Sequence, residues 1–147
     1  MTVKSVDVIQ KDIVKEFQEA GDWLETYALI VRKGRELRSL EPDERRSDHA
    51  LPGCQSNVWL KVSMQGGVIR LQADSDALIT KGILSLLIRV YDRQTPADVL
   101  DAKLHFLDDI GLSTNLSPSR RDGLTSIVRR IREFAAANTL PPTTSLR

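Results

Sequence analysis

The stretch Leu51-Pro52-Gly53-Cys54-Gln55-Ser56-Asn57-Val58-Trp59-Leu60 joins a tight turn to the start of a strand. It contains Cys54, which is the only cysteine among the 147 residues. Pro52 restricts its own backbone and that of Leu51, while Gly53 permits a sharp bend. From Asn57 onward, polar and apolar residues alternate as they do in a half-buried strand. The stretch therefore predicts a single thiol on a short loop at the edge of a sheet.

Two strands joined by a hairpin turn follow this loop. Apolar residues occupy every second position, first at Val58, Leu60, Val62 and Met64, then at Ile69, Leu71 and Ala73. Gln65-Gly66-Gly67 lies between them, and its glycines tolerate the positive φ that tight hairpins require. Because two strands are marginal by themselves, we expect helices to cover one face of this small antiparallel sheet.

Apolar residues at helical spacing predict the remaining elements. Two helices, over residues 6–20 and 23–33, are separated by Gly21 and Asp22 and should form an N-terminal hairpin. A long, buried helix is expected over residues 77–91, two short helices between Thr95 and Gly111, and a last helix from Pro118 to Phe134. We predict an α+β fold with one domain over residues 1–137, followed by a frayed tail at 138–147.

Three finer expectations concern the long helix and the last one. Asp74, Ser75 and Asp76 are placed to cap the helix over residues 77–91. Gly82 lies inside this helix, where it costs about 1 kcal/mol relative to alanine, and close packing against the sheet would explain it. In the last helix, the residues expected to point outward are Arg121, Arg129, Arg130 and Arg132.

Composition and charge exclude several classes of function. Charged residues make up 28% of the chain but the net charge is only +1, so no strong field for nucleic acid is implied. The sequence has no apolar run of about 18 residues, which a membrane span would need. Its first residues lack the apolar stretch of a signal peptide. A lone cysteine cannot form an internal disulfide, and a free thiol suits a reducing compartment. We therefore expect a cytoplasmic protein with no nucleic-acid or membrane partner.

The residue types around Cys54 leave several roles open. A lone cysteine is most often a small buried hydrophobe, although Cys54 lies in turn chemistry rather than in an apolar run. Cys54 and His49 could form the nucleophilic pair of a thiol hydrolase, but no third orienting residue is evident. Cys54, His49 and His105 match no common zinc spacing, so no metal site is expected.

A family resemblance favours one of these roles. Gly53-Cys54-Gln55-Ser56, one residue, then Val58-Trp59-Leu60 resembles the signature of the SufE family of sulfur-acceptor proteins. The likeness continues in order and spacing through Asp74-Ser75-Asp76-Ala77, Lys81-Gly82, Thr95-Pro96, Leu116-Ser117-Pro118-Ser119-Arg120 and Gly123-Leu124, and it reaches back to Trp23, Tyr27, Leu29-Ile30 and Gly34. It covers most of the chain, from about Phe17 to Phe134.

The resemblance implies that the chain carries sulfur as a persulfide on Cys54. The donor would be a SufS-type cysteine desulfurase, which the chain would stimulate, and the sulfur would pass to a downstream iron–sulfur scaffold complex. The chain would then be a carrier and activator rather than an enzyme in its own right. Pyridoxal phosphate would belong to the desulfurase, so no cofactor is expected here. An alternative from another class is a non-covalent adaptor in which Cys54 is only packed.

The resemblance also implies supporting residues around Cys54. Gly53, Gln55 and Ser56 belong to the signature itself. Arg120 matches the arginine of the Ser-Pro-x-Arg block, where a cation would favour a thiolate or contact an acidic partner. A surface arginine near a helix N-terminus is the simpler alternative. Asp76 matches the family's second aspartate and is interpreted first as a helix-start acid, second as part of a partner-facing surface.

Overall fold

The computed structural model describes residues 4–45, 49–51 and 56–139. Helices α1 (Val6–Phe17) and α2 (Trp23–Arg35) are followed by strands β1 (Val58–Gln65) and β2 (Val68–Ser75) and by helix α3 (Leu78–Tyr91). Four helices complete the described chain: α4 (Pro96–Asp101), α5 (Phe106–Asp109), α6 (Leu112–Asn115) and α7 (Pro118–Ala137). The predicted α+β class and the N-terminal helical pair are confirmed. The predicted position of Cys54 on a loop at the sheet edge lies outside the described residues, as does most of the predicted tail.

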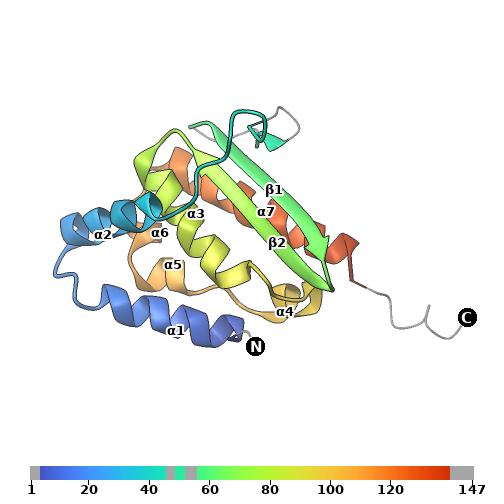
Figure 1. Cartoon of the computed structure of the whole chain (residues 1–147). Helices are drawn as coiled ribbons and strands as arrows, with labels where there is room; N and C mark the ends of the chain where they lie inside the picture. Colours follow the sequence, from blue (N-terminus) through green and yellow to red (C-terminus); the bar gives the residue numbers. More distant parts are fainter. Residues whose placement is uncertain (1–3, 46–48, 52–55, 140–147) are drawn as a thin grey trace, which may run out of the picture.

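The two strands pair in an antiparallel hairpin with Val58 opposite Ser75 and Gln65 opposite Val68. Gly66 and Gly67 form the turn with φ of 60° and 84°, as their sequence predicts. Alternate residues of both strands are buried, among them Leu60, Ile69 and Leu71. Helix α3 lies along β2, and α7 passes behind β1 (Figure 1). The helices therefore cover one face of the hairpin, which leaves the other face to the segment that precedes β1.

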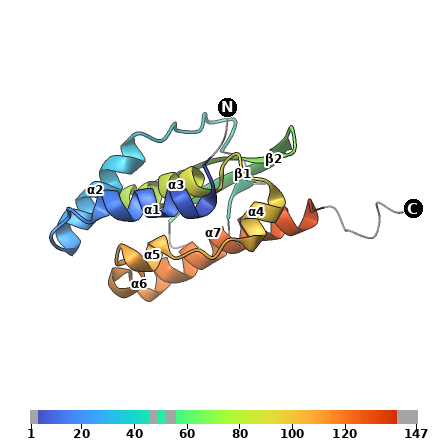
Figure 2. The ribbon, with the colours of Figure 1, turned by 90° about the horizontal axis from the view of Figure 1, so that it is seen from below.

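Helix α3 is the centre of the hydrophobic core. Its buried residues surround most of its circumference: Ile79, Gly82, Ile83, Leu84, Leu86, Leu87, Val90 and Tyr91. Figure 2 shows α1, α2 and α3 on one side of the molecule and α5, α6 and α7 on the other. The prediction of a central buried helix is confirmed.

Gly82 does not pack against the sheet, so that expectation was wrong. It meets Gly34 of α2 where the two helices cross: a Cβ on Gly34 would lie 2.6 Å from the Gly82 nitrogen. A Cβ on Gly82 would collide with the carbonyl oxygen and side chain of Ile30. The two glycines let α2 and α3 approach at backbone distance, which explains why neither helix carries a larger residue there.

Arg132 also departs from its prediction. It does not point outward but donates to the carbonyl oxygens of Val99 (3.0 Å) and Leu100 (3.1 Å). A cation that binds the last carbonyls of a helix is favoured by their partial negative charge. Arg132 therefore fastens α7 to α4, whereas Arg129 and Arg130 are exposed. Within the described ranges, no helix is both long and apolar enough to cross a membrane.

Candidate functional site

The structure describes three of the six predicted site residues. Ser56, Asp76 and Arg120 are placed, whereas Gly53, Cys54 and Gln55 lie outside the described residues. The site can therefore be built from the residues that flank residues 52–55 and from the elements that position them.

Both flanks of residues 52–55 are held against the sheet. On the N-terminal side, the Leu51 amide donates to the Val58 carbonyl (2.9 Å), and Ala50 forms an isolated antiparallel bridge with Trp59. On the C-terminal side, the Ser75 hydroxyl donates to the Asn57 carbonyl (2.7 Å). The residues on either side of the Cys54 segment are therefore fixed to the strands.

Asp76 binds Asn57 instead of capping α3. Its carboxylate accepts hydrogen bonds from the Asn57 amide (3.1 Å) and from the Asn57 side chain (2.8 Å). The N-cap of α3 is Ala77, which offers no side-chain acceptor. The prediction that residues 74–76 cap α3 was wrong, because none of their side chains accepts from an amide within the helix. Ser75 Oγ accepts only from the Ala77 amide that precedes the helix (3.2 Å), and the two aspartates also bind groups distant in sequence. Asp76 is exposed and fixes the backbone three residues after Cys54.

Arg120 and Ser56 border the same small hollow. Arg120 is the third residue of α7, and its guanidinium donates to the Thr80 hydroxyl in the first turn of α3 (3.1 Å). The walls of the hollow are mainly apolar and include Val58, Ile83 and Ile127. The first turns of two helices and one cation therefore lie beside Ser56, two residues after Cys54. Helix N-termini and a guanidinium favour an anion over a neutral group.

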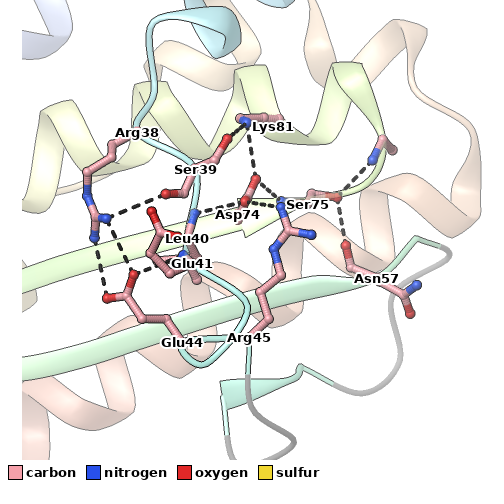
Figure 3. A network of polar contacts seen from close by, with 11 residues as sticks. Arg38, Ser39, Leu40, Glu41, Glu44, Arg45, Asn57, Asp74, Ser75 and Lys81 are labelled. Atoms are coloured by element: carbon pink, nitrogen blue, oxygen red, sulfur yellow. Dashed lines mark hydrogen bonds and ion pairs between the residues drawn. The ribbon is translucent and has the colours of Figure 1, made fainter.

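The carboxylate of Asp74, which was predicted to cap α3, holds the segment before β1 against the sheet on the other flank (Figure 3). The Asp74 side chain is fully buried and accepts from Arg45 (2.7 Å) and from the backbone amides of Leu40 (3.0 Å) and Ser75 (2.8 Å). Lys81 Nζ lies 3.3 Å from one of its oxygens. Burial would raise the pKa of Asp74, but these donors outweigh it and lower the pKa below its ordinary value. Asp74 is therefore an ionised anchor.

Arg45 connects the buried Asp74 carboxylate to the outer face of β1. Its guanidinium lies 5.1 Å from the ring centre of Trp59, a cation–π distance. Glu44 beside it accepts from Arg38 (3.4 Å) and lies 3.9 Å from Lys61 of β1. Residues 38–45 and 49–51 are thus attached to β1, β2 and α3 at several points, and we call them the strap. Residues 52–55 follow directly after the strap in the sequence.

The other candidate groups show no comparable arrangement. His49 Nδ1 lies 2.9 Å from the Glu44 carbonyl, and His105 Nδ1 lies 2.6 Å from an Asp109 carboxylate oxygen. Across the described parts of the chain, no three histidine or acidic side chains are grouped to hold a metal ion. A larger groove of about 640 Å³ runs along α7 between Leu107, Leu124 and Val128, but no residue of the strap lines it.

The geometry defines an α+β domain in which both flanks of a cysteine-containing segment are fixed, close to a sheet edge and to the N-termini of two helices. Residues 11–135 match the model of the SufE family, described as an Fe-S metabolism associated domain. The match covers most of the chain, so the chain belongs to the SufE family and its role is associated with iron–sulfur metabolism.

The fold has a counterpart among solved structures. It is similar to the solution structure of a hypothetical protein from Thermus thermophilus, with a TM-score of 0.70 over 88% of this chain and 94% of that one. The two sequences are 19% identical. This likeness shows that the arrangement of helices around a β-hairpin recurs in another protein, and it concerns the fold alone.

Proposed function

We propose that the chain accepts sulfur on Cys54 from a SufS-type, pyridoxal-phosphate-dependent cysteine desulfurase, stimulates that enzyme and passes the sulfur towards iron–sulfur cluster assembly. The observation that carries the proposal is the match to the SufE family over residues 11–135, a range that includes the chain's only thiol. The cofactor is the desulfurase's, and the chain acts as a carrier in the cytoplasm.

The transfer is a displacement at sulfur. The Cys54 thiolate attacks the outer sulfur of a cysteine persulfide on the desulfurase. The S–S bond of that persulfide breaks, and a new S–S bond forms between the outer sulfur and Cys54. The desulfurase cysteine leaves as a thiolate, and Cys54 becomes the persulfide. No electrons are gained or lost overall, so neither a metal nor a second cysteine is required. A chain with one cysteine also cannot discharge the persulfide into an internal disulfide.

The surroundings of the segment support this chemistry. A thiolate and a persulfide are both anions, and the groups beside Ser56 are Arg120 and the first turns of α3 and α7. Positive charge close to a cysteine lowers its pKa and raises the fraction that can react. The flanking residues Leu51 and Asn57 are hydrogen-bonded to the strands on either side of this segment.

Stimulation of the desulfurase distinguishes the carrier from the adaptor. We expect the wild-type chain to accelerate sulfide release from L-cysteine by a purified desulfurase, and Cys54→Ser to abolish the acceleration while still binding. An adaptor would keep its stimulation after the substitution. A thiol hydrolase that used Cys54 and His49 would instead turn over thioester substrates with no desulfurase present.

A further inference from the structure

The groove along α7 is a large surface feature that the proposed function does not yet use. It has a volume of about 640 Å³ and lies between α7 and the segment from Leu104 to Ser113, which includes α5. Figure 2 shows α5, α6 and α7 together on one side of the molecule. Four half-buried apolar side chains line the groove: Leu104, Leu107, Leu124 and Val128. A groove of this size with apolar walls is typical of a binding site.

The groove adjoins the hollow beside Ser56. Leu124 lines both the groove and that hollow, whose wall also contains Arg120. From Arg121 the groove follows α7 as far as Ala136, a rise of about 22 Å or about four helical turns. A partner segment of that length would therefore dock along α7 and reach the hollow that borders the cysteine-containing segment.

Arginines are spread along the groove rather than gathered at one end. Arg121 donates to the Ser113 carbonyl (3.1 Å), and Arg132 donates to two carbonyl oxygens of α4, so both guanidiniums have fixed positions. Arg129 is exposed and forms no hydrogen bond or ion pair in the part of the chain that the structure describes. Fixed cations lower the entropic cost of binding an acidic partner, and Arg129 is available to one.

Two acids also border the groove but leave it net positive. They are Asp108, which accepts from the Ser113 hydroxyl, and Glu133, against three arginines. A polypeptide with several acidic residues would meet these arginines along its length, whereas an amphiphile with one anionic head group would meet them at one end only. The distribution of charge therefore favours an acidic polypeptide.

The walls of the groove favour a helix over an extended chain. α7 uses its backbone groups within its own helix, so it offers no free edge with which an extended segment could pair. Averaged over its length, the groove has a cross-section of roughly 30 Å², which admits a row of side chains but not a whole helix about 10 Å across. The occupant should therefore lay one apolar face on the groove and keep its polar face in water.

We propose that the groove along α7 docks an acidic amphipathic helix of the protein that receives sulfur from Cys54. The identity of this partner rests on the proposed function. Leu107 and Val128 bury the apolar face of the helix, and the arginines pair with acids on its flanks. Because the groove adjoins the hollow without including it, the acceptor can begin to bind before the desulfurase has left Cys54.

Titration calorimetry with an iron–sulfur scaffold complex, the acceptor in the proposed function, tests the groove without sulfur chemistry when the chain carries Cys54→Ser. Arg129→Glu reverses a charge at the groove. Arg130→Glu is the matched control, because Arg130 is equally exposed and adjacent on α7 but does not line the groove. Arg129→Glu should raise the Kd about tenfold or more, and Arg130→Glu should leave it unchanged.

A filled groove gives a second test that does not depend on charge. Ala136→Trp places an indole in the groove, and Ala137→Trp is its control, because Ala137 is also exposed but lies outside the groove. Only Ala136→Trp should weaken binding of the scaffold complex. Circular dichroism checks that each variant is folded.

Sulfur transfer from radiolabelled L-cysteine separates this proposal from the proposed function. With Cys54 restored, the wild type and all four variants should take up label from a desulfurase equally. Arg129→Glu and Ala136→Trp should then need about tenfold more scaffold complex for half-maximal transfer, with the maximal rate kept. Uptake that fails in the wild type would refute the proposed function, and the calorimetric titration would still decide on the groove.

A scaffold complex that does not bind, or that binds Arg129→Glu and Ala136→Trp as tightly as their controls, overturns the proposal. Loss of label uptake by Arg129→Glu but not by Arg130→Glu would assign the groove to the desulfurase, and it would equally overturn docking of the acceptor.

Discussion

Replacing Asp74 by asparagine removes the charge from the buried carboxylate that holds residues 38–45 against the hairpin. The isosteric amide keeps one acceptor but places an NH₂ group towards donors, so at least one of Arg45, Lys81 and two backbone amides loses its partner. Breaking a buried ion pair typically costs about 3–5 kcal/mol. The Arg45 and Lys81 side chains are 40% and 19% exposed and can regain water, which reduces the cost to about 2–3 kcal/mol.

Chemical denaturation at pH 7 measures this change. For a chain of this length, about 2–3 kcal/mol corresponds to a fall of roughly 5–10 °C in the thermal midpoint. Hydrogen exchange at the Leu40 and Ser75 amides should accelerate more than at amides of α7. Asp12→Asn is the matched control, because Asp12 pairs with Lys4 at an exposed site and its loss should cost less than about 1 kcal/mol.

The pH dependence of this effect has a definite sign. The folded-state pKa of Asp74 is below its ordinary value, so its stabilisation is fully present above the unfolded pKa and is lost as the pH falls through the folded pKa. The difference between wild type and Asp74→Asn should therefore shrink in acid. A difference below about 0.5 kcal/mol at pH 7, with the Leu40 amide still protected, would refute the anchoring role.

Three further predictions concern other contacts. Arg120→Ala should weaken desulfurase stimulation and, because it removes the bond to Thr80, cost about 0.5–1.5 kcal/mol of stability; stimulation that stays intact would make Arg120 purely structural. Gly82→Ala should destabilise the fold by about 1–3 kcal/mol in denaturant titrations despite the higher helix propensity of alanine, since its Cβ collides with Ile30; a more stable variant would contradict the crossing at Gly34. Hydrogen bonds from Arg89 lower the pKa of Glu16 from 4.5 to about 2. Lys33 contributes to this lowering, and partial burial of the carboxylate opposes it. The stabilisation by ionised Glu16 is therefore present above about pH 4.5 and is lost as the pH falls towards 2. Glu16→Gln should cost about 1 kcal/mol of stability at pH 7, a figure reduced because the side chain is partly exposed, and almost nothing at pH 2. Equal costs at both pH values would exclude the ion pair as the cause.

Sequence patterns predicted the helices and strands that are specified by residues close together in the chain. Alternation from Val58 to Met64 and the glycines at 66 and 67 were sufficient for the hairpin. Proline at the first helical position marks the starts of α4 and α7, and the residues before the prolines, Thr95 and Ser117, cap these helices by accepting from backbone amides. In each case the interacting residues are within a few positions of one another.

The errors concern contacts between distant residues. Nothing near Gly82 in sequence shows that its neighbour is Ile30, and nothing near Asp74 shows that Arg45 and Leu40 will satisfy its carboxylate. The capping prediction failed because Asp74 and Asp76 have better acceptor roles across the fold than at the start of α3. In the site, Ser56 and Arg120, which both belong to the family's sequence blocks, border the same hollow. The strap of residues 38–45 and 49–51 depends on contacts with Asp74 and β1 that no local pattern indicates.

The sulfur of Cys54 is the atom on which the proposed function depends, and intact-mass spectrometry can detect a second sulfur bound to it. The wild-type chain is incubated with a cysteine desulfurase and L-cysteine, with Cys54→Ser as the control. We expect the wild-type mass to increase by one sulfur atom, a reductant to reverse the increase, and fragmentation to place the sulfur on Cys54. An unchanged wild-type mass beside a demonstrably active desulfurase, or the same increase in Cys54→Ser, would contradict the proposed function.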